Sequence, residues 1–336
     1  MKYLTVISFA LIAFFSNAQQ KPTYSLSRSF SIPSPGGWDY LSVGPNNKLY
    51  ISHSTQVNVV DLKTGDSVGV IKGTTGVHGI AFNPLLNKGY TSNGRLNNVF
   101  VFNLTDQLIT ATIAVGQNPD YIFYENFSNK IITCNGKSHD LTVIDPLTEK
   151  VVATILVGGK PETAMSDGKG KLFVNVEDKN EIVVIDLKAF KVVNHWSLLP
   201  GEAPTGLAID VKKGKLYSTC SDSKTLVIMS TSDGKILQSL PIGSGCDGVV
   251  FDASKNRLFS SNGDGTSTII NTNTSDGSAE VIETLATLKS ARTNAIDEKT
   301  HKLYFPVADF DVPTTPNGRA PLKSGTFRVL EFAPLK

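Results

Sequence analysis

The chain has 336 residues, of which 40% are hydrophobic and 18% are charged, and its formal net charge is +2. This composition is typical of a folded globular protein whose surface carries many uncharged turn residues. Near-neutral charge and the lack of a dense Lys/Arg run argue against a nucleic-acid partner, because a phosphate-binding protein needs a basic surface.

The first eighteen residues are predicted to be a signal peptide. Lys2 precedes an apolar run over residues 4–15. The sequence Ser16-Asn17-Ala18 then places small residues at the two positions that signal peptidase reads, which predicts cleavage after Ala18. A membrane anchor is the alternative, but the apolar run is shorter than the roughly 20 residues that span a bilayer. Gln19 in place of a cysteine argues against a lipoprotein. We therefore expect a periplasmic or secreted mature chain, monomeric and without a transmembrane segment.

A repeat organises the remainder of the chain. Residues 119–160 contain four short runs rich in β-branched and aromatic residues, separated by turn-forming clusters, which predicts four strands. The same order of signals recurs in units that start near residues 37, 77, 119, 161, 204, 246 and 291. A unit of this size cannot bury both faces of its sheet alone, and radial stacking leaves few exposed edges. The sequence therefore predicts an all-β fold for residues 19–336, a seven-bladed β-propeller with four-stranded antiparallel blades.

The two ends of the chain are expected to close this ring together. Residues 24–32 alternate like an outer strand but precede the first complete unit. Residues 326–332 resemble a third strand, and too little chain follows them for a fourth. We therefore predict that the N-terminal strand joins the last blade.

Polar residues are predicted to gather at one end of the axial channel. Aligning the units on the Lys-apolar-aromatic step of the second strand, as in Lys48-Leu49-Tyr50, places one residue of each unit at the start of the innermost strand. These residues are Asp39, His78, Asp120, Glu162, Thr205, Asp247 and Arg292, spaced 39 to 45 apart. The loops after the second strands open on the same face and add Asn93, Asn135 and Asn262.

The last unit has a long loop on this face, over residues 306–324, which contains Asp309, Asp311 and Arg319. Loops of this length inside a compact domain are usually functional or disordered. We expect it to cover the channel mouth.

Three interpretations of the polar ring remain open. The ring residues can simply solvate the channel and pair with one another. Carboxylate and Asn oxygens also suit a hard cation such as Ca²⁺ or Mg²⁺. Crowded carboxylates and a histidine can instead supply an acid and a base, with Arg292 binding an anionic substrate. No phosphate loop, dinucleotide fingerprint, Cys-x-x-Cys or His-Glu-x-x-His motif is present, so no cofactor is identified.

Three cysteines occur, at positions 134, 220 and 246. In an oxidising compartment two of them are candidates for a disulfide. Cys220 ends a second strand and Cys246 opens the next unit, so these two are the candidate pair. The alternative is three small, partly buried thiols.

Several segments resemble the YVTN-repeat β-propellers, and the secreted YncE-like branch most closely. The resemblance rests on residues 171–176 (KLFVNV), 182–186 (IVVID) and 150–159 (KVVATILVGG), and it spans roughly residues 37–310. It implies the fold and export but no catalytic residue. Such propellers are mostly described as binding or surface-layer modules, although one relative resembles a DNA binder and similar rings form parts of oxidoreductases and lactonases. Relatives often carry a cysteine where this chain has Gly201, which leaves Cys220 without that partner.

Two functional hypotheses follow. The first is an exported, non-catalytic propeller that binds a small ligand, a peptide or a protein at the channel mouth. The second is a hydrolase or lyase that acts on a sugar or lactone-like metabolite with a ring carboxylate or His78 as the base, with or without a divalent cation.

Overall fold

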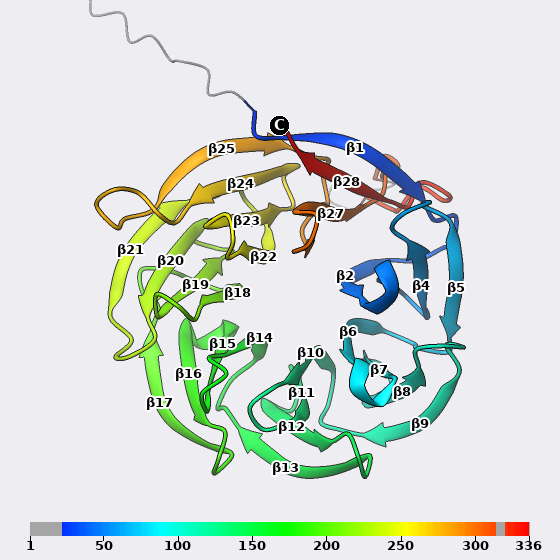
Figure 1. Cartoon of the computed structure of the whole chain (residues 1–336), viewed down its shortest axis with the longest axis horizontal. Coiled ribbons are helices and arrows are strands. Elements are labelled where there is room, and N and C mark those ends of the chain that lie inside the picture. Colours follow the sequence, from blue (N-terminus) through cyan, green and yellow to red (C-terminus); the bar gives the residue numbers. More distant parts are fainter. Residues whose placement is uncertain (1–21, 314–319, 336) are drawn as a thin grey trace, which may run out of the picture.

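Seven four-stranded antiparallel sheets surround a central channel in the computed structural model, which describes residues 22–313 and 320–335 (Figure 1). The predicted seven-bladed propeller is confirmed. The predicted signal peptide lies outside the described residues. No helix in the described part of the chain is long and apolar enough to cross a membrane.

Each blade runs from an innermost strand at the channel to an outermost strand at the rim. The innermost strands are β2 (Trp38–Gly44), β6 (Val77–Asn83), β10 (Pro119–Glu125), β14 (Pro161–Ser166), β18 (Pro204–Asp210), β22 (Cys246–Asp252) and β26 (Ala295–Asp297). The second strands are β3 (Lys48–His53), β7 (Lys88–Asn93), β11 (Lys130–Asn135), β15 (Lys171–Val176), β19 (Lys215–Cys220), β23 (Arg257–Asn262) and β27 (Lys302–Val307).

The third strands are β4 (Gln56–Asp61), β8 (Asn98–Asn103), β12 (Asp140–Asp145), β16 (Glu181–Asp186), β20 (Thr225–Ser230), β24 (Thr266–Asn271) and β28 (Arg328–Pro334). The outermost strands are β5 (Ser67–Lys72), β9 (Ile109–Ala114), β13 (Lys150–Leu156), β17 (Lys191–Ser197), β21 (Ile236–Pro241), β25 (Glu280–Ala286) and β1 (Tyr24–Ser31). Three short 3-10 turns, η1 (Pro45–Asn47), η2 (Pro84–Leu86) and η3 (Glu177–Lys179), lie between strands.

The hydrophobic core lies between the blades. Several second strands carry the Lys-apolar-aromatic step, and its aromatic side chains are fully buried, as for Tyr50, Phe173 and Tyr217. Tyr50 packs against Phe82 of the next blade, with ring centroids 4.8 Å apart. Because each sheet buries side chains on both faces against its neighbours, no blade is stable by itself. This packing holds the innermost strands around the channel.

The ring closes as predicted. The N-terminal strand β1 pairs antiparallel with β28 and completes the last blade in the order β1-β28-β27-β26. Figure 1 shows the two strands side by side at the top of the ring. Tyr24, Phe30 and Ile32 are buried there, and both ends of the chain contribute to the hydrophobic clusters on either side of the last blade.

The candidate disulfide between Cys220 and Cys246 is not present in the structure, which has free thiols, the alternative left open by the sequence. Both side chains are free and buried. Cys220 packs between the fourth and fifth blades, near Leu198 and Val227, whereas Cys246 packs between the fifth and sixth, near Leu226 and Leu258. The sheet of the fifth blade therefore lies between the two thiols, which strand order alone does not reveal.

Position 201 is the better partner for Cys220. A Cβ atom built on Gly201 would lie 2.7 Å from the Cys220 Sγ atom. We predict that Gly201→Cys forms a disulfide with Cys220 in an oxidising compartment and raises the free energy of unfolding by about 2–3 kcal/mol. Counting free thiols in denaturant should give two in the variant against three in the parent. Gly201→Ser is the matched control, and equal thiol reactivity of Cys220 in both variants would contradict the prediction.

Candidate functional site

Six of the predicted ring residues surround one polar cavity of about 300 Å³ at the channel mouth. They are Asp39, His78, Asp120, Glu162, Asp247 and Arg292. Tyr40, Lys160 and Glu177 complete the wall. The cavity is hereafter the mouth chamber. Residues separated by up to about 250 positions in the chain thus share one small space, as the repeat alignment predicts.

A backbone irregularity places these side chains. The pairing of the first and second strands shifts register at the mouth in six blades, for example between Trp38 and Leu41 and between Pro119 and Ile122. The ring residue lies inside each shift, and such bulges redirect side chains. Hydroxyl groups then tie neighbouring innermost strands together, as when Thr293 Oγ1 donates to the Asp39 carbonyl at 2.8 Å.

His78 lies between two carboxylates. Its Nδ1 is 2.5 Å from Asp39 Oδ2 and 3.8 Å from Asp120 Oδ1. Burial opposes protonation of the imidazole, but the hydrogen bond to Asp39 and the charge of Asp120 outweigh it and raise the pKa of His78 to about 9. The histidine is therefore cationic at neutral pH and donates to Asp39.

Asp120 is the chamber carboxylate whose oxygens have the fewest nearby hydrogen-bond donors. No donor among the described residues lies within hydrogen-bond distance of its carboxylate, and its side chain is 13% exposed. Burial raises the pKa of Asp120 to about 7, helped by the charges of Asp39 and Asp247 and opposed by His78. Burial also raises the pKa of Asp247 and of Glu162.

Two further cations belong to the chamber. Arg292 donates to Asp247 and lies 3.5 Å from Asp39. Lys160 lies 2.5 Å from Glu162 and also contacts Glu177. Five carboxylates therefore face three cationic side chains (Lys160, Arg292 and protonated His78), which leaves a net charge of 3 − 5 = −2 when all are ionised.

Three residues of the mouth chamber were not predicted from the sequence. Tyr40 follows Asp39 directly, and Lys160 precedes the innermost strand of the fourth blade by one position. Glu177 follows the second strand of that blade, in the group of loops expected on this face. Lys160 and Glu177 lie outside the aligned strand position, so comparing units at that position alone could not identify them.

The predicted asparagines do not reach the chamber. Asn93, Asn135 and Asn262 are fully buried, and none lines the cavity. The amide of Asn135 donates to Asp140 at 2.6 Å and to Thr142 at 2.8 Å, and the other two make equivalent bonds inside their own blades. Each ends a second strand and holds the start of the third, because a buried amide must be hydrogen-bonded. Thr205 likewise donates to the Cys246 carbonyl, at 2.8 Å.

The long loop of the last blade lies beside the chamber. Its described residues Phe310, Pro321 and Leu322 line a separate cavity of about 420 Å³, together with Trp38 and Arg292. Arg319 lies outside the described residues. The loop therefore contacts the mouth on the side of Arg292, and its role as a cover stays a prediction.

The raised pKa values predict that the protein is less stable at high pH. A raised pKa means that the folded state binds the proton more tightly, so the stability from Asp120 is complete below about pH 4 and lost by pH 7. The stability contributed by protonated His78 is complete below pH 6.5 and is lost by pH 9. We expect Asp120→Asn to melt at the same temperature as the parent below about pH 4 and at least about 2–4 °C higher at pH 8. Thermal melts by circular dichroism test this, and a difference independent of pH would contradict it.

Comparison with protein families matches residues 89–303 to the YNCE-like beta-propeller family. The chain belongs to this family. The family resemblance predicted from the repeat residues is thus confirmed. No curated protein matches the sequence. Among solved structures, this YNCE-like propeller is similar to Kuenenia stuttgartiensis hydrazine synthase, with a TM-score of 0.70 and 15% identity over 80% of this chain and 92% of that one. At that identity the likeness concerns the fold alone.

Proposed function

We propose that the protein is an exported, non-catalytic propeller that binds a small cationic ligand, such as an amine, in the mouth chamber. The observation that carries this proposal is the Asp120 carboxylate, which is 13% exposed, has no donor within hydrogen-bond distance among the described residues, and lies in a chamber with five carboxylates against three cationic side chains. An ammonium group would supply the missing donor and charge. Export is supported by the N-terminal sequence pattern, and N-terminal sequencing of the mature protein tests it.

The volume of the mouth chamber limits the size of the ligand. A volume of about 300 Å³ lies at the lower end of the range for small-molecule sites. A small amine or a single basic side chain of a peptide fits this volume, whereas a folded protein surface does not enter it. We therefore favour a small molecule or a peptide side chain over a large interface.

Calorimetry with a diamine tests this function. Putrescine should bind and 1,4-butanediol, its neutral analogue, should not. Because the pKa of Asp120 is about 7, binding of a cation should expel a proton, and the observed heat should depend on the buffer's ionisation enthalpy. Asp120→Asn should weaken putrescine binding at least tenfold, a loss of about 1.4 kcal/mol. Glu298→Gln, an exposed carboxylate elsewhere, should leave binding unchanged. Equal binding of both probes would contradict the proposal.

A metal-assisted hydrolase or lyase is the second candidate. One ligand atom each from Asp39, His78 and Asp120 lies within 4.8 Å of the others. Two carboxylates and one imidazole fit a transition metal such as Zn²⁺ or Mn²⁺ better than Ca²⁺, which prefers six to eight oxygens. The asparagine oxygens expected to serve Ca²⁺ or Mg²⁺ instead accept hydrogen bonds from hydroxyl groups within their own blades.

In this candidate the three residues would hold the ion, which would polarise a carbonyl or activate water. Lys160 and Arg292, at the same chamber wall, would bind an anionic substrate group. Metal analysis of untagged protein and a melting shift with Zn²⁺ or Mn²⁺ test it. A melting shift with either ion should disappear in His78→Gln. The absence of bound metal together with the absence of such a shift would contradict this candidate.

A further inference from the structure

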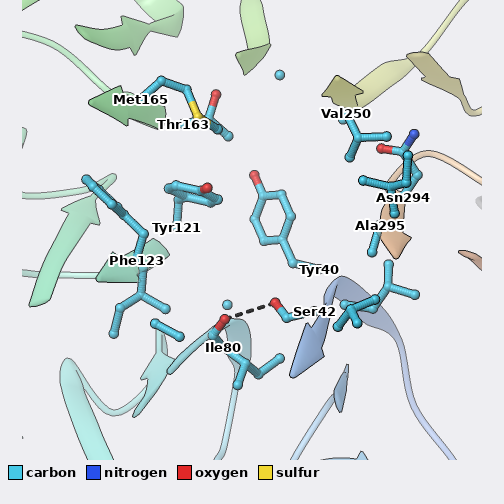
Figure 2. Close-up of a pocket in the computed structure, with 18 of the residues that line it drawn as sticks. Tyr40, Ser42, Ile80, Tyr121, Phe123, Thr163, Met165, Val250, Asn294 and Ala295 are labelled. Atoms are coloured by element: carbon cyan, nitrogen blue, oxygen red, sulfur yellow. Dashed lines mark hydrogen bonds between the residues drawn. The ribbon is translucent and has the colours of Figure 1, made fainter. Parts of the chain in front are cut away.

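The other half of the axial channel is a second cavity, of about 420 Å³. Figure 2 shows residues from the innermost strands projecting into it, among them Tyr40, Tyr121, Phe123 and Met165. Val250 faces them from the sixth blade. Propeller channels are commonly wet and polar, whereas this wall is mainly aromatic and aliphatic. The cavity is hereafter the aromatic chamber.

Tyr40 lies between the aromatic chamber and the mouth chamber. Tyr40 lines both cavities. Its ring meets the Tyr121 ring edge to face, with centroids 5.6 Å apart and planes at 72°. Tyr40 therefore separates a charged compartment from an apolar one, and a ligand suited to one chamber does not suit the other.

Two hydroxyl groups of the aromatic chamber are already hydrogen-bonded across blades. Ser42 Oγ donates to the Ile80 carbonyl at 2.9 Å, the bond drawn in Figure 2. Thr163 Oγ1 donates to the Thr205 carbonyl at 2.5 Å. These hydroxyl protons join neighbouring blades and are not free to bind water or a ligand.

Asn294 carries a buried acceptor without a partner. Its side-chain nitrogen donates to the Phe259 carbonyl at 2.9 Å, but its Oδ1 has no hydrogen-bond partner among the described residues. The residue is 8% exposed, and Figure 2 shows the oxygen directed toward the cavity. An unpaired buried acceptor is costly, by about 1–3 kcal/mol, unless a molecule in the cavity donates to it.

We propose that the aromatic chamber is a second binding site, for a small planar aromatic molecule with one hydrogen-bond donor, such as an indole or a phenol. The flat faces and edges of Tyr40, Tyr121 and Phe123 suit stacked or edge-to-face contact with an aromatic ring. The Met165 thioether can contact a ring edge. A single N–H or O–H group would satisfy Asn294 Oδ1. This site is independent of the cationic ligand proposed for the mouth chamber.

Isothermal titration with indole and indene tests the proposal. The two molecules have nearly the same shape, but only indole carries an N–H donor. Indole should bind the full mature protein with a Kd on the order of 0.1–1 mM, as expected for a ligand of this size. Indene should bind at least fivefold more weakly. Absence of indole binding at 5 mM, or equal binding of both compounds, would overturn the proposal.

Cavity-filling variants locate the site. Val250→Phe should abolish indole binding, and Val68→Phe, on the exposed outer strand β5, should leave it unchanged. Met165→Phe provides a second filling variant should Val250→Phe fail to fold, as judged by its melting curve. Asp120→Asn should retain indole binding although it loses putrescine binding. The proposals for the two chambers can therefore be tested and contradicted separately. Indole binding that survives both filled variants would place the site elsewhere and refute the assignment.

Discussion

Deleting residues 19–35 is expected to lower the melting temperature by more than about 10 °C. The deletion removes β1, the outermost strand of the last blade, and exposes the edge of β28. Tyr24 is buried between the last blade and the sixth, and Phe30 and Ile32 are buried between the last blade and the first. Each contributes about 1.5–3 kcal/mol. Each kcal/mol corresponds to about 2–4 °C for a protein somewhat smaller than this one. Differential scanning calorimetry of the two mature chains measures the effect.

Two point variants on β1 separate strand packing from a general effect of truncation. Phe30→Ser removes a buried side chain and should lower the melting temperature by several degrees. Leu26→Ser changes a side chain that is 55% exposed on the same strand, and should have an effect within about 1 °C. Adding a peptide of residues 19–35 to the truncated protein should restore stability in a concentration-dependent way. An unchanged transition in the truncated protein would refute the closure.

Glu331→Gln is expected to cost about 2–4 kcal/mol, or about 5–10 °C in melting temperature. The Glu331 side chain is fully buried on β28. Arg28 of β1 contacts it at 2.7 Å and Lys302 of β27 at 3.0 Å. Arg28 also donates to the Leu62 and Lys63 carbonyls, so this carboxylate anchors the residue that connects the last blade to the first.

The same carboxylate predicts acid sensitivity. Burial would raise the pKa of Glu331, but hydrogen bonds from Arg28, Ser27 and Lys302 outweigh it and lower the pKa to about 2. A lowered pKa means that this stability is present above about pH 4.5 and is lost as the pH falls toward 2. The parent should therefore lose more stability than Glu331→Gln between pH 5 and pH 3. Melts of both proteins and of the exposed control Glu298→Gln measure this, and parallel curves would contradict it.

The repeat made the architecture predictable. A period of about 42 residues with four strand signals in each unit leaves radial stacking as the economical way to bury both faces of each sheet. The incomplete last unit and the spare strand at residues 24–32 then predict the closure by β1. Each of these inferences depends on local signals repeated along the chain, which is why the sequence suffices.

The mouth chamber was predictable in part. Asp39, His78 and Asp120 occupy equivalent positions of successive units, so a correct alignment is enough to bring them together. Asn93 also holds a fixed position in its unit, yet its amide bonds within the blade. Whether a side chain at a strand end turns to the channel or into the sheet depends on local register shifts, which the alignment does not contain.

The sequence by itself determined the seven-bladed ring, its closure by both ends of the chain, and six of the residues that share the channel mouth, because a repeat encodes equivalent positions. Only the tertiary structure decided that Cys220 and Cys246 face different blade interfaces. It also decided that Lys160 and Glu177 join the mouth chamber, and that Tyr40 separates this chamber from an apolar one. These features depend on distances between blades, and no pattern along a single chain records them.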